Sequence, residues 1–125
     1  MNAKSLLTVA AAAVIMSGCA EKPKPLYSFG TYSESYYAYK KDMSDESALA
    51  LQKAIEEAIA KAGDSSSGRV PPGMYANLGY LYLKAGKSKE AIASFEKEKR
   101  TYPESAHFMD RIIKKVETAE GGDKK

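Results

Sequence analysis

Residues 72–105 read PGMYANLGYLYLKAGKSKEAIASFEKEKRTYPES, and this stretch decides the fold. Gly79 and Ala91 have almost no side chain, so two antiparallel helices can approach each other closely where these residues meet. Larger side chains around that contact would fill the space on either side: Tyr75, Leu78, Tyr82 and Phe95. Gly86 is placed to end the first helix, and Pro103 is placed to stop the second. The stretch therefore predicts a helical hairpin.

The spacing of these residues resembles that of the tetratricopeptide repeat, although Tyr75 replaces the usual Trp and Glu98 stands where the repeat normally has Ala. A weaker copy of the first-helix signature lies upstream and another lies downstream: Phe29-x2-Tyr32-Ser33-x2-Tyr36 and Met109-x2-Ile112-Ile113-x2-Val116. We therefore expect an all-α fold of tetratricopeptide-like hairpins with about five helices: one degenerate repeat, one good repeat and a capping helix.

The remaining helices follow from apolar periodicity. A long helix from about Ser44 to Ala62 would pack against the upstream copy through one apolar face, formed by Leu51, Ile55, Ala58 and Ile59. Residues 63–70 are rich in Ser and Gly and predict a flexible connector, after which Pro71 and Pro72 would start the next helix. The capping helix would end near Ala119. The predicted helical domain spans residues 26–119, and residues 120–125 form a disordered tail.

The N-terminus has the order of a secretory signal, with a positive start, an apolar run and small residues. The apolar run is about 11 residues long, whereas a membrane-spanning helix needs about 20. Residues 16–19, Met-Ser-Gly-Cys, resemble the lipobox of bacterial lipoproteins, in which the Cys receives the lipid. Cys19 is the predicted lipid-attachment residue, so residues 1–18 would be removed. The alternative is an ordinary signal cut after Ala20, because Gly18-x-Ala20 also fits a small-x-small cleavage site.

The lipobox resemblance also implies a location. Residues 19–25 include two alternating prolines and predict an extended tether at about 3.1 Å per residue. Lipoproteins with Asp directly after the Cys stay in the inner membrane, and Ala20 stands there in this chain. The expected location is the periplasmic face of the outer membrane.

The composition excludes several function classes. The chain contains one Cys, one His and no Trp, so it has no residues for a disulfide framework or a Cys/His nucleophile pair, and we expect no metal or cofactor. A net charge of +3 without a basic stripe does not predict nucleic-acid binding. Acidic pairs such as Glu56-Glu57 lie among lysines on solvated faces. We therefore expect that the protein is not an enzyme.

The stretch from Leu26 to Tyr39, behind a lipobox and ahead of one hairpin, resembles a family of small bacterial lipoproteins that carry the motif L-Y-x-W-G-x-Y. Phe29 stands in place of the motif's Trp. Genes of that family often lie beside genes for a lipoprotein like the curli secretion pore. The resemblance therefore implies an envelope complex that includes a secretion-pore lipoprotein, and it implies no activity.

Candidate partner-binding residues come from tetratricopeptide proteins, whose concave face is lined by first-helix residues just outside the packing signature. The corresponding positions are Ala76, Asn77, Tyr80 and Lys84 in the good repeat, and His107, Asp110, Arg111 and Lys114 in the cap. From these we select Asn77, Tyr80, Lys84, Arg111 and Lys114, a net basic set that suits an acidic or C-terminal peptide. The alternative is a solvated face without a ligand.

Five of the nine tyrosines lie between Tyr27 and Tyr39. One helical stripe with a spacing of three and four residues predicts core packing: Phe29, Tyr32, Tyr36, Tyr39 and Met43. Tyr27 and Tyr37 are the expected exposed members. The predicted function is that of a protein-interaction or assembly factor for an envelope complex. The alternative is a module that binds peptidoglycan or another glycan through exposed tyrosines.

Overall fold

The computed structural model describes residues 20–122. Within this range there are five α-helices and no strand, which confirms the predicted all-α class. The helices are α2 (Tyr32–Asp42), α3 (Asp45–Ala60), α4 (Met74–Lys84), α5 (Ser88–Thr101) and α6 (Ala106–Gly122). Two short 3-10 turns, Ala62–Asp64 and Pro103–Ser105, follow α3 and α5.

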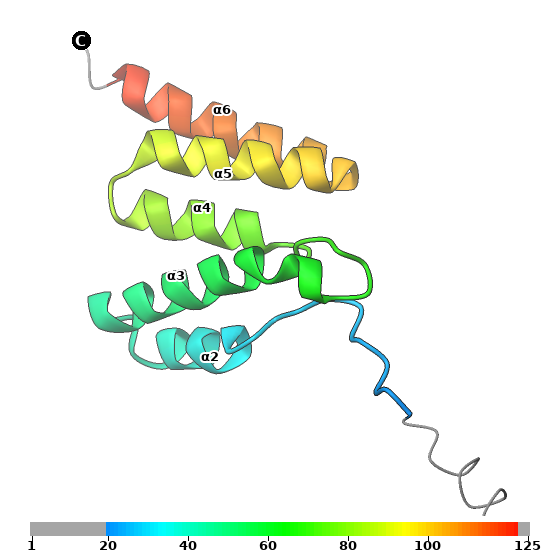
Figure 1. Cartoon of the computed structure of the whole chain (residues 1–125). Helices are drawn as coiled ribbons and strands as arrows, with labels where there is room; N and C mark the ends of the chain where they lie inside the picture. Colours follow the sequence, from blue (N-terminus) through cyan, green and yellow to red (C-terminus); the bar gives the residue numbers. More distant parts are fainter. Residues whose placement is uncertain (1–19, 123–125) are drawn as a thin grey trace, which may run out of the picture.

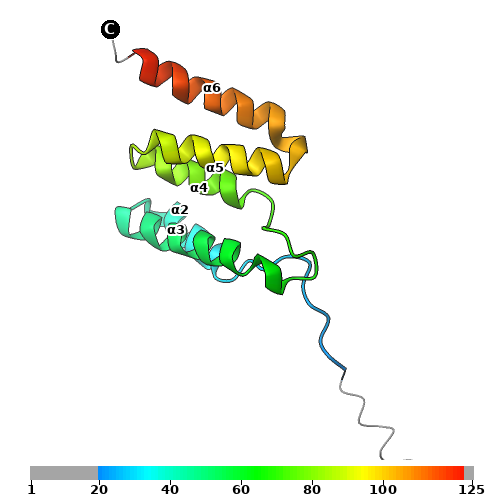
Figure 2. The ribbon, with the colours of Figure 1, turned by 45° about the horizontal axis from the view of Figure 1, so that its top comes forward.

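The helices stack in chain order. α2 and α3 form one antiparallel pair, α4 and α5 form the next, and α6 lies along the outer side of α5 (Figure 1). A second view shows the same sequence of layers, with α6 at one end of the stack and the α2–α3 pair at the other (Figure 2). The N-terminal segment leaves the stack beside the connector between α3 and α4. The α2–α3 turn, the α4–α5 turn and the C-terminal end of α6 lie at the opposite side (Figure 1).

The α4–α5 pair makes the close approach that its small residues predict. Gly79 and Ala91 are both buried, and a Cβ atom added at Gly79 would lie only 2.5 Å from Cε1 of Phe95. Gly86 has φ +73, as expected for a glycine that ends a helix. Its N–H donates to the Leu83 carbonyl at 3.0 Å, and the Lys87 N–H donates to the Tyr82 carbonyl at 2.8 Å. This pair of hydrogen bonds is the Schellman arrangement, and it satisfies the last carbonyls of α4.

Two apolar clusters form the core. The first joins α2, α3 and α4 and contains Tyr39, Leu51, Ile55, Ala58, Met74, Leu78 and Leu81. The second joins α5 and α6 and contains Ala91, Phe95, Met109 and Ile113. The half-buried side chain of Tyr82 packs against both. The predicted apolar faces of α3 and α6 are therefore confirmed, and α4 is the element that joins the two clusters.

The start of α4 differs from the prediction, because the helix begins at Met74 rather than at Pro72. Gly73 precedes it with φ +85 and has no side chain to cap the helix. Glu98 of α5 does so instead: its carboxylate accepts from the Gly73 N–H at 2.8 Å and from the Ala76 N–H at 3.3 Å. The Glu98 side chain is only 4% exposed. Glu98, which stands where the tetratricopeptide repeat normally has Ala, therefore caps the N-terminus of α4.

The prediction of a buried aromatic stripe was largely wrong. Tyr39 is buried and Tyr32 is half-buried, but Phe29, Tyr36 and Met43 are exposed. α2 begins only at Tyr32, so Phe29 lies before the helix, and Met43 has left-handed backbone angles at its end. α3 packs against one side of α2, and α4 does not close over the face of α2 that carries Tyr36 and Met43, so these side chains stay open to solvent.

The connector is held in place rather than loose. The Ser66 N–H donates to the Pro25 carbonyl at 2.9 Å, and the Ser67 N–H donates to the Leu26 carbonyl at 3.3 Å. The Tyr102 hydroxyl donates to the Val70 carbonyl at 2.7 Å. Pro25, placed in the predicted tether, is thus bonded to the helical domain. At the other end of the chain, α6 continues to Gly122, three residues beyond the expected end at Ala119.

Candidate protein-binding groove

An open groove of about 280 Å³ lies between α2 and α4. Its floor comes from three buried residues of the first core cluster, one on each of three helices: Tyr39 on α2, Leu51 on α3 and Leu81 on α4. The remaining lining residues lie around this floor: Tyr36, Lys40, Met43, Asn77, Tyr80 and Lys84. The groove therefore exists because α2 and α4 both rest on α3 without closing over it.

One hydrogen bond fixes the spacing of the two groove walls. The Asn77 side-chain amide of α4 donates to the Tyr32 hydroxyl of α2 at 2.7 Å. Burial raises the pKa of Tyr32, and the neighbouring Tyr36 adds to the rise, so the hydroxyl stays protonated at neutral pH. The wall spacing thus does not depend on a group that titrates near neutral pH.

The walls present aromatic and apolar surface to solvent. Tyr36 is 39% exposed, Tyr80 is 46% exposed and Met43 is 53% exposed. The ring of Tyr80 packs edge-on against Phe95, with the ring centroids 5.8 Å apart. Tyr36 ends a row of neighbouring aromatic rings that runs back through Tyr32, Phe29 and Tyr27 with centroid separations of 5.7, 6.4 and 6.3 Å. Exposed aromatic rings with one fixed side are typical of sites that bind proteins or sugars.

The charged residues in the groove lining are both lysines. Lys40 stands on α2 and Lys84 on α4, and no carboxylate lines the groove. The Lys84 Nζ lies 5.7 Å from the centroid of the Tyr39 ring, within range of a cation–π interaction. Within residues 20–122 neither lysine takes part in an ion pair, since the two that form both involve Lys99.

A second open hollow, of about 640 Å³, adjoins the groove around the end of α2. The two share Tyr39, Met43, Leu81 and Lys84 in their linings. The adjoining hollow adds Lys87 and a single carboxylate, Asp45. Taken together, the continuous surface carries more positive than negative charge.

The structure brings some of the predicted binding residues together and separates others. Asn77, Tyr80 and Lys84 line the groove. Arg111 and Lys114 instead line a different hollow on α6, with Lys115, Thr118 and Ala119. Ala76 packs against the second core cluster, His107 is exposed, and Asp110 pairs with Lys99 at 2.7 Å. The predicted set therefore divides between two surfaces.

Sequence reasoning missed the α2 wall of the groove. It assigned Tyr36 and Met43 to the core and did not select Lys40. The exposed members of the aromatic stripe could have been found only by knowing that α2 is covered on one side. The sequence did indicate that Lys40 and Tyr36 belong to one surface, because Lys40 follows Tyr36 by one helical turn and lies on the same helix face.

The part of the chain that the structure describes contains neither a cluster of metal-ligating side chains nor a membrane-spanning helix. From Ala20 to Gly122, no group of three or more His, Cys, Asp or Glu side chains is arranged to hold a metal ion. None of the helices in the same range has the length and apolar character needed to cross a membrane. Cys19, the predicted lipid-attachment residue, lies outside the described residues.

These features define a class: a small all-α protein of stacked helical hairpins with an aromatic groove on one face. The family model of the domain of unknown function DUF4810 matches residues 26–112, and the chain belongs to this family. The matched range contains both hairpins and the whole groove. No curated protein matches the chain, and no solved structure matches it.

Proposed function

We propose that this protein is a lipid-anchored lipoprotein of the bacterial envelope that binds a protein partner through the groove between α2 and α4. The observation that carries the proposal is the groove itself, where exposed Tyr36 and Tyr80 stand beside Lys40 and Lys84, which have no partner carboxylate in its lining. Exposed aromatic surface in a concavity is costly to leave in solvent and is typical of interaction sites, and unpaired cations beside it add a preference for acidic partners.

We further propose that the two hairpins are a tetratricopeptide-type stack. The contact of Gly79 with Phe95 and the burial of Ala91 support this assignment, because they place the signature residues in the roles that the repeat gives them. In such stacks the first helices of successive hairpins line one face. α2 and α4 are those helices, and they line the groove.

The proposed anchor is the lipid on Cys19, at the periplasmic face of the outer membrane. Ser66 and Ser67 hold Pro25 and Leu26 against the connector, so the free tether is short, with a reach of about 20 Å. The tether leaves the domain beside the connector between α3 and α4. Met43 and Lys84 stand at the C-terminal ends of α2 and α4, and these ends lie on the side of the stack away from the connector (Figure 1). An anchored domain would thus hold this end of the groove away from the bilayer, toward periplasmic partners.

The proposed role is that of an assembly or scaffolding factor for an envelope complex, which the family resemblance suggests includes a curli-type secretion-pore lipoprotein. Tethering in two dimensions raises the effective concentration of membrane neighbours, so that weak groove contacts suffice. We propose binding rather than catalysis, since the lining of the groove contains no Ser, Cys, His, Asp or Glu side chain.

Two measurements test this proposal. The anchor is tested by a Cys19→Ala variant: we expect loss of incorporated fatty acid and release of the protein from the membrane fraction, with helical circular dichroism unchanged. A Cys19→Ala variant that stays in the membrane fraction would contradict the anchor.

The groove is tested in cells by replacing Tyr80 with a photo-crosslinking amino acid. We expect a discrete crosslinked envelope protein from Tyr80 and none from a matched probe at Lys53, an exposed position on α3 outside the groove. Equal crosslinking from both positions, or none from Tyr80, would count against a binding role for the groove.

One observation favours a second candidate function. Tyr37 is 72% exposed and lies one residue from Tyr36, so the open side of α2 presents neighbouring aromatic rings to solvent. Rings of this kind can stack on sugars, as a peptidoglycan-binding module requires. Purified sacculi would retain the protein in a sedimentation assay, and a Tyr36→Ala, Tyr37→Ala variant would stay in the supernatant. A protein-binding groove predicts that both stay in the supernatant.

A further inference from the structure

We propose that the occupant of the groove is an extended protein segment in which one large apolar side chain is flanked by acidic residues. This inference rests on the proposed function and narrows it to a chemical class of partner. It is carried by the buried apolar floor of the groove, by the charge of its lining and by the hydrogen-bonding groups left open in its wall.

The apolar floor and the small volume of the groove account for the apolar side chain. Leu51 is 2% exposed and Leu81 and Tyr39 are each 7% exposed, so the floor is part of the core. A volume of about 280 Å³ is near the lower limit for ligand sites, and it suits one large side chain better than a folded element. Tyr36 and Tyr80 would contact the sides of that residue.

The charge of the groove accounts for the acidic residues. Lys40 and Lys84 approach from opposite walls, and Lys87 follows in the adjoining hollow. The one carboxylate in these linings, Asp45, leaves at least two of the three cations uncompensated. Because Lys40 and Lys84 lie on opposite walls, each in the last turn of its helix, carboxylates next to the apolar residue would meet a lysine on either wall.

The wall also offers hydrogen bonds to an extended backbone. Asn77 donates one hydrogen bond to Tyr32, and a side-chain amide can make up to four. The Asn77 side chain lines the groove, where its oxygen can accept a hydrogen bond from a peptide N–H and its remaining N–H can donate to a peptide carbonyl. A backbone held at Asn77 would run along the groove between the lysines.

Other occupants fit this charge less well. A second copy of this chain carries a net charge of +3 and would bring more cations to a cationic groove. Neutral sugar rings would stack on the tyrosines but would leave the lysines unpaired. An acidic segment satisfies both the aromatic and the charged surface.

Peptide binding to the purified mature protein tests the inference. The probe is a short fluorescein-labelled peptide, acetylated and amidated, with a central phenylalanine flanked on each side by two glutamates. The matched peptide carries glutamines in place of the glutamates. We expect the glutamate peptide to bind about tenfold more tightly, and we expect this difference to shrink when the salt concentration is raised to about 0.5 M.

Substitutions locate the site. A K40Q/K84Q variant should lower the affinity for the glutamate peptide by about tenfold and leave that for the glutamine peptide unchanged. Tyr80→Ala should lower the affinity for both peptides. The matched control is Lys114→Gln, which removes a lysine from the α6 hollow and should change neither affinity. Circular dichroism of each variant separates loss of binding from loss of fold.

Several results would overturn the inference. The first is equal binding of the two peptides, or no binding of either. The second is a loss of affinity in Lys114→Gln as large as that in K40Q/K84Q. The third is another occupant: retention on sacculi that the glutamate peptide does not reduce, or concentration-dependent self-association that K84Q abolishes. The crosslinking experiment at Tyr80 remains separate. A partner captured there when neither peptide binds would leave the binding role standing and refute only the acidic occupant.

Discussion

At the scale of single residues, Glu98 links the two helices of the central hairpin through its charge. Its carboxylate stands on α5 but accepts hydrogen bonds from Gly73 and Ala76 at the start of α4, where no local side chain caps the helix. Negative charge at a helix N-terminus is also favoured by the helix dipole. A residue that departs from the repeat pattern is therefore a structural requirement of this chain.

We expect Glu98→Ala to lower the free energy of unfolding by about 2 kcal/mol, since it leaves two N–H groups without their partner. Glu98→Gln keeps one acceptor oxygen and should lose less. Urea denaturation followed by circular dichroism measures both. Glu96→Gln is the matched control, because the Glu96 pair with Lys99 is partly exposed and its removal should cost less than about 0.5 kcal/mol. An equal loss of stability in Glu98→Ala and Glu96→Gln would refute the capping role.

Gly79 sets the distance between α4 and α5. A Cβ there would lie 2.5 Å from Cε1 and 2.8 Å from Cδ1 of the fully buried Phe95 ring. We expect Gly79→Ala to destabilise the fold by about 1–3 kcal/mol despite the better helix propensity of alanine. Adding Phe95→Leu to it should recover part of the loss in a double-mutant cycle. Gly63→Ala is the control, because a Cβ at Gly63 meets no atom within 4 Å.

At the scale of elements, the corner between α2 and α3 is built by three polar side chains. Ser44 caps α3 by accepting from the Ser47 N–H at 3.1 Å. Asp42 accepts from the Ser47 hydroxyl at 2.6 Å and from the Ser44 N–H at 3.1 Å. These hydrogen bonds, led by that from the Ser47 hydroxyl, hold the pKa of Asp42 below its ordinary value.

The sign of the resulting pH dependence follows from that lowered pKa. Asp42 stabilises the corner above its ordinary pKa of 3.8, and this contribution is lost as the pH falls through the lower pKa of the folded protein. We expect Ser47→Ala to raise the pKa of Asp42 toward its ordinary value in a carboxyl NMR titration. Ser33→Ala, at an exposed position of α2, should leave it unchanged. An Asp42 pKa that does not respond to Ser47→Ala would contradict this account of the corner.

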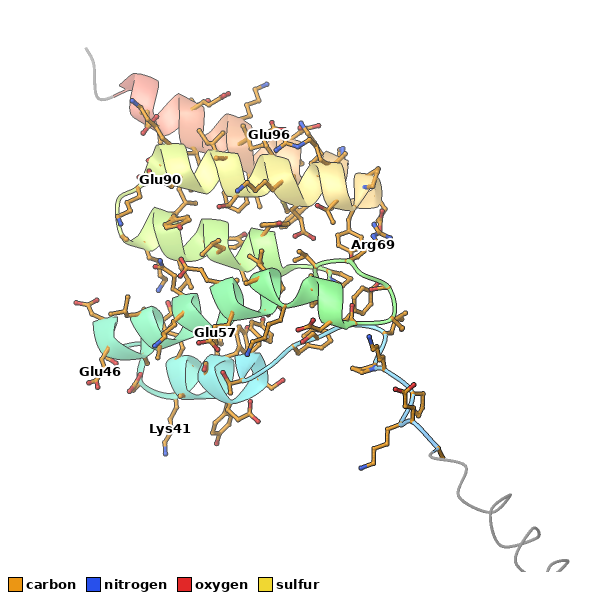
Figure 3. All side chains as sticks on the ribbon, in the orientation of Figure 1. Lys41, Glu46, Glu57, Arg69, Glu90 and Glu96 are labelled. Carbon is orange, nitrogen blue, oxygen red and sulfur yellow. The ribbon has the colours of Figure 1, made fainter. Side chains whose placement is uncertain are left out.

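At the scale of the whole molecule, Tyr102 connects distant parts of the chain. It is 5% exposed, its hydroxyl donates to the Val70 carbonyl, and the Arg69 guanidinium lies 4.6 Å from its ring centroid. Arg69 stands where the connector meets the end of α5 (Figure 3). Burial raises the pKa of Tyr102 to about 12, and the hydroxyl of Tyr27 adds to the rise. The N-terminal segment, the connector and α5 thus meet at one side chain.

This raised pKa predicts a loss of stability in alkali. The contribution of Tyr102 is fully present below its ordinary pKa of 10.0 and declines as the pH rises toward about 12. We expect Tyr102→Phe to be less stable at neutral pH by about 1 kcal/mol, because the Val70 carbonyl loses its donor, and to show a shallower alkaline decline. Urea denaturation at several pH values measures both effects. Identical alkaline slopes for the two proteins would contradict the assignment.

The pattern of residues within short stretches of the sequence was sufficient to predict much of the fold. The apolar faces of α3 and α6, the end of α4 at Gly86 and the contact between Gly79 and the α5 face depend on residues close in sequence, whose spacing matches the helical period. The all-α class followed from these features. Asn77, Tyr80 and Lys84 were selected by their positions in the tetratricopeptide repeat that this stretch resembles, and they line the groove.

The sequence by itself determined which segments are helices and which residues of α4 face outward, because helical periodicity and helix-ending residues act over a few positions. Only the tertiary structure decided that α2 keeps one side open, that Glu98 caps α4 and that Pro25 and Leu26 bond to the connector. Each of these depends on a neighbour far along the chain, and the exposure of a side chain is fixed by what packs over it. The groove exists for the same reason, since its walls on α2 and α4 meet only across the floor that α3 provides.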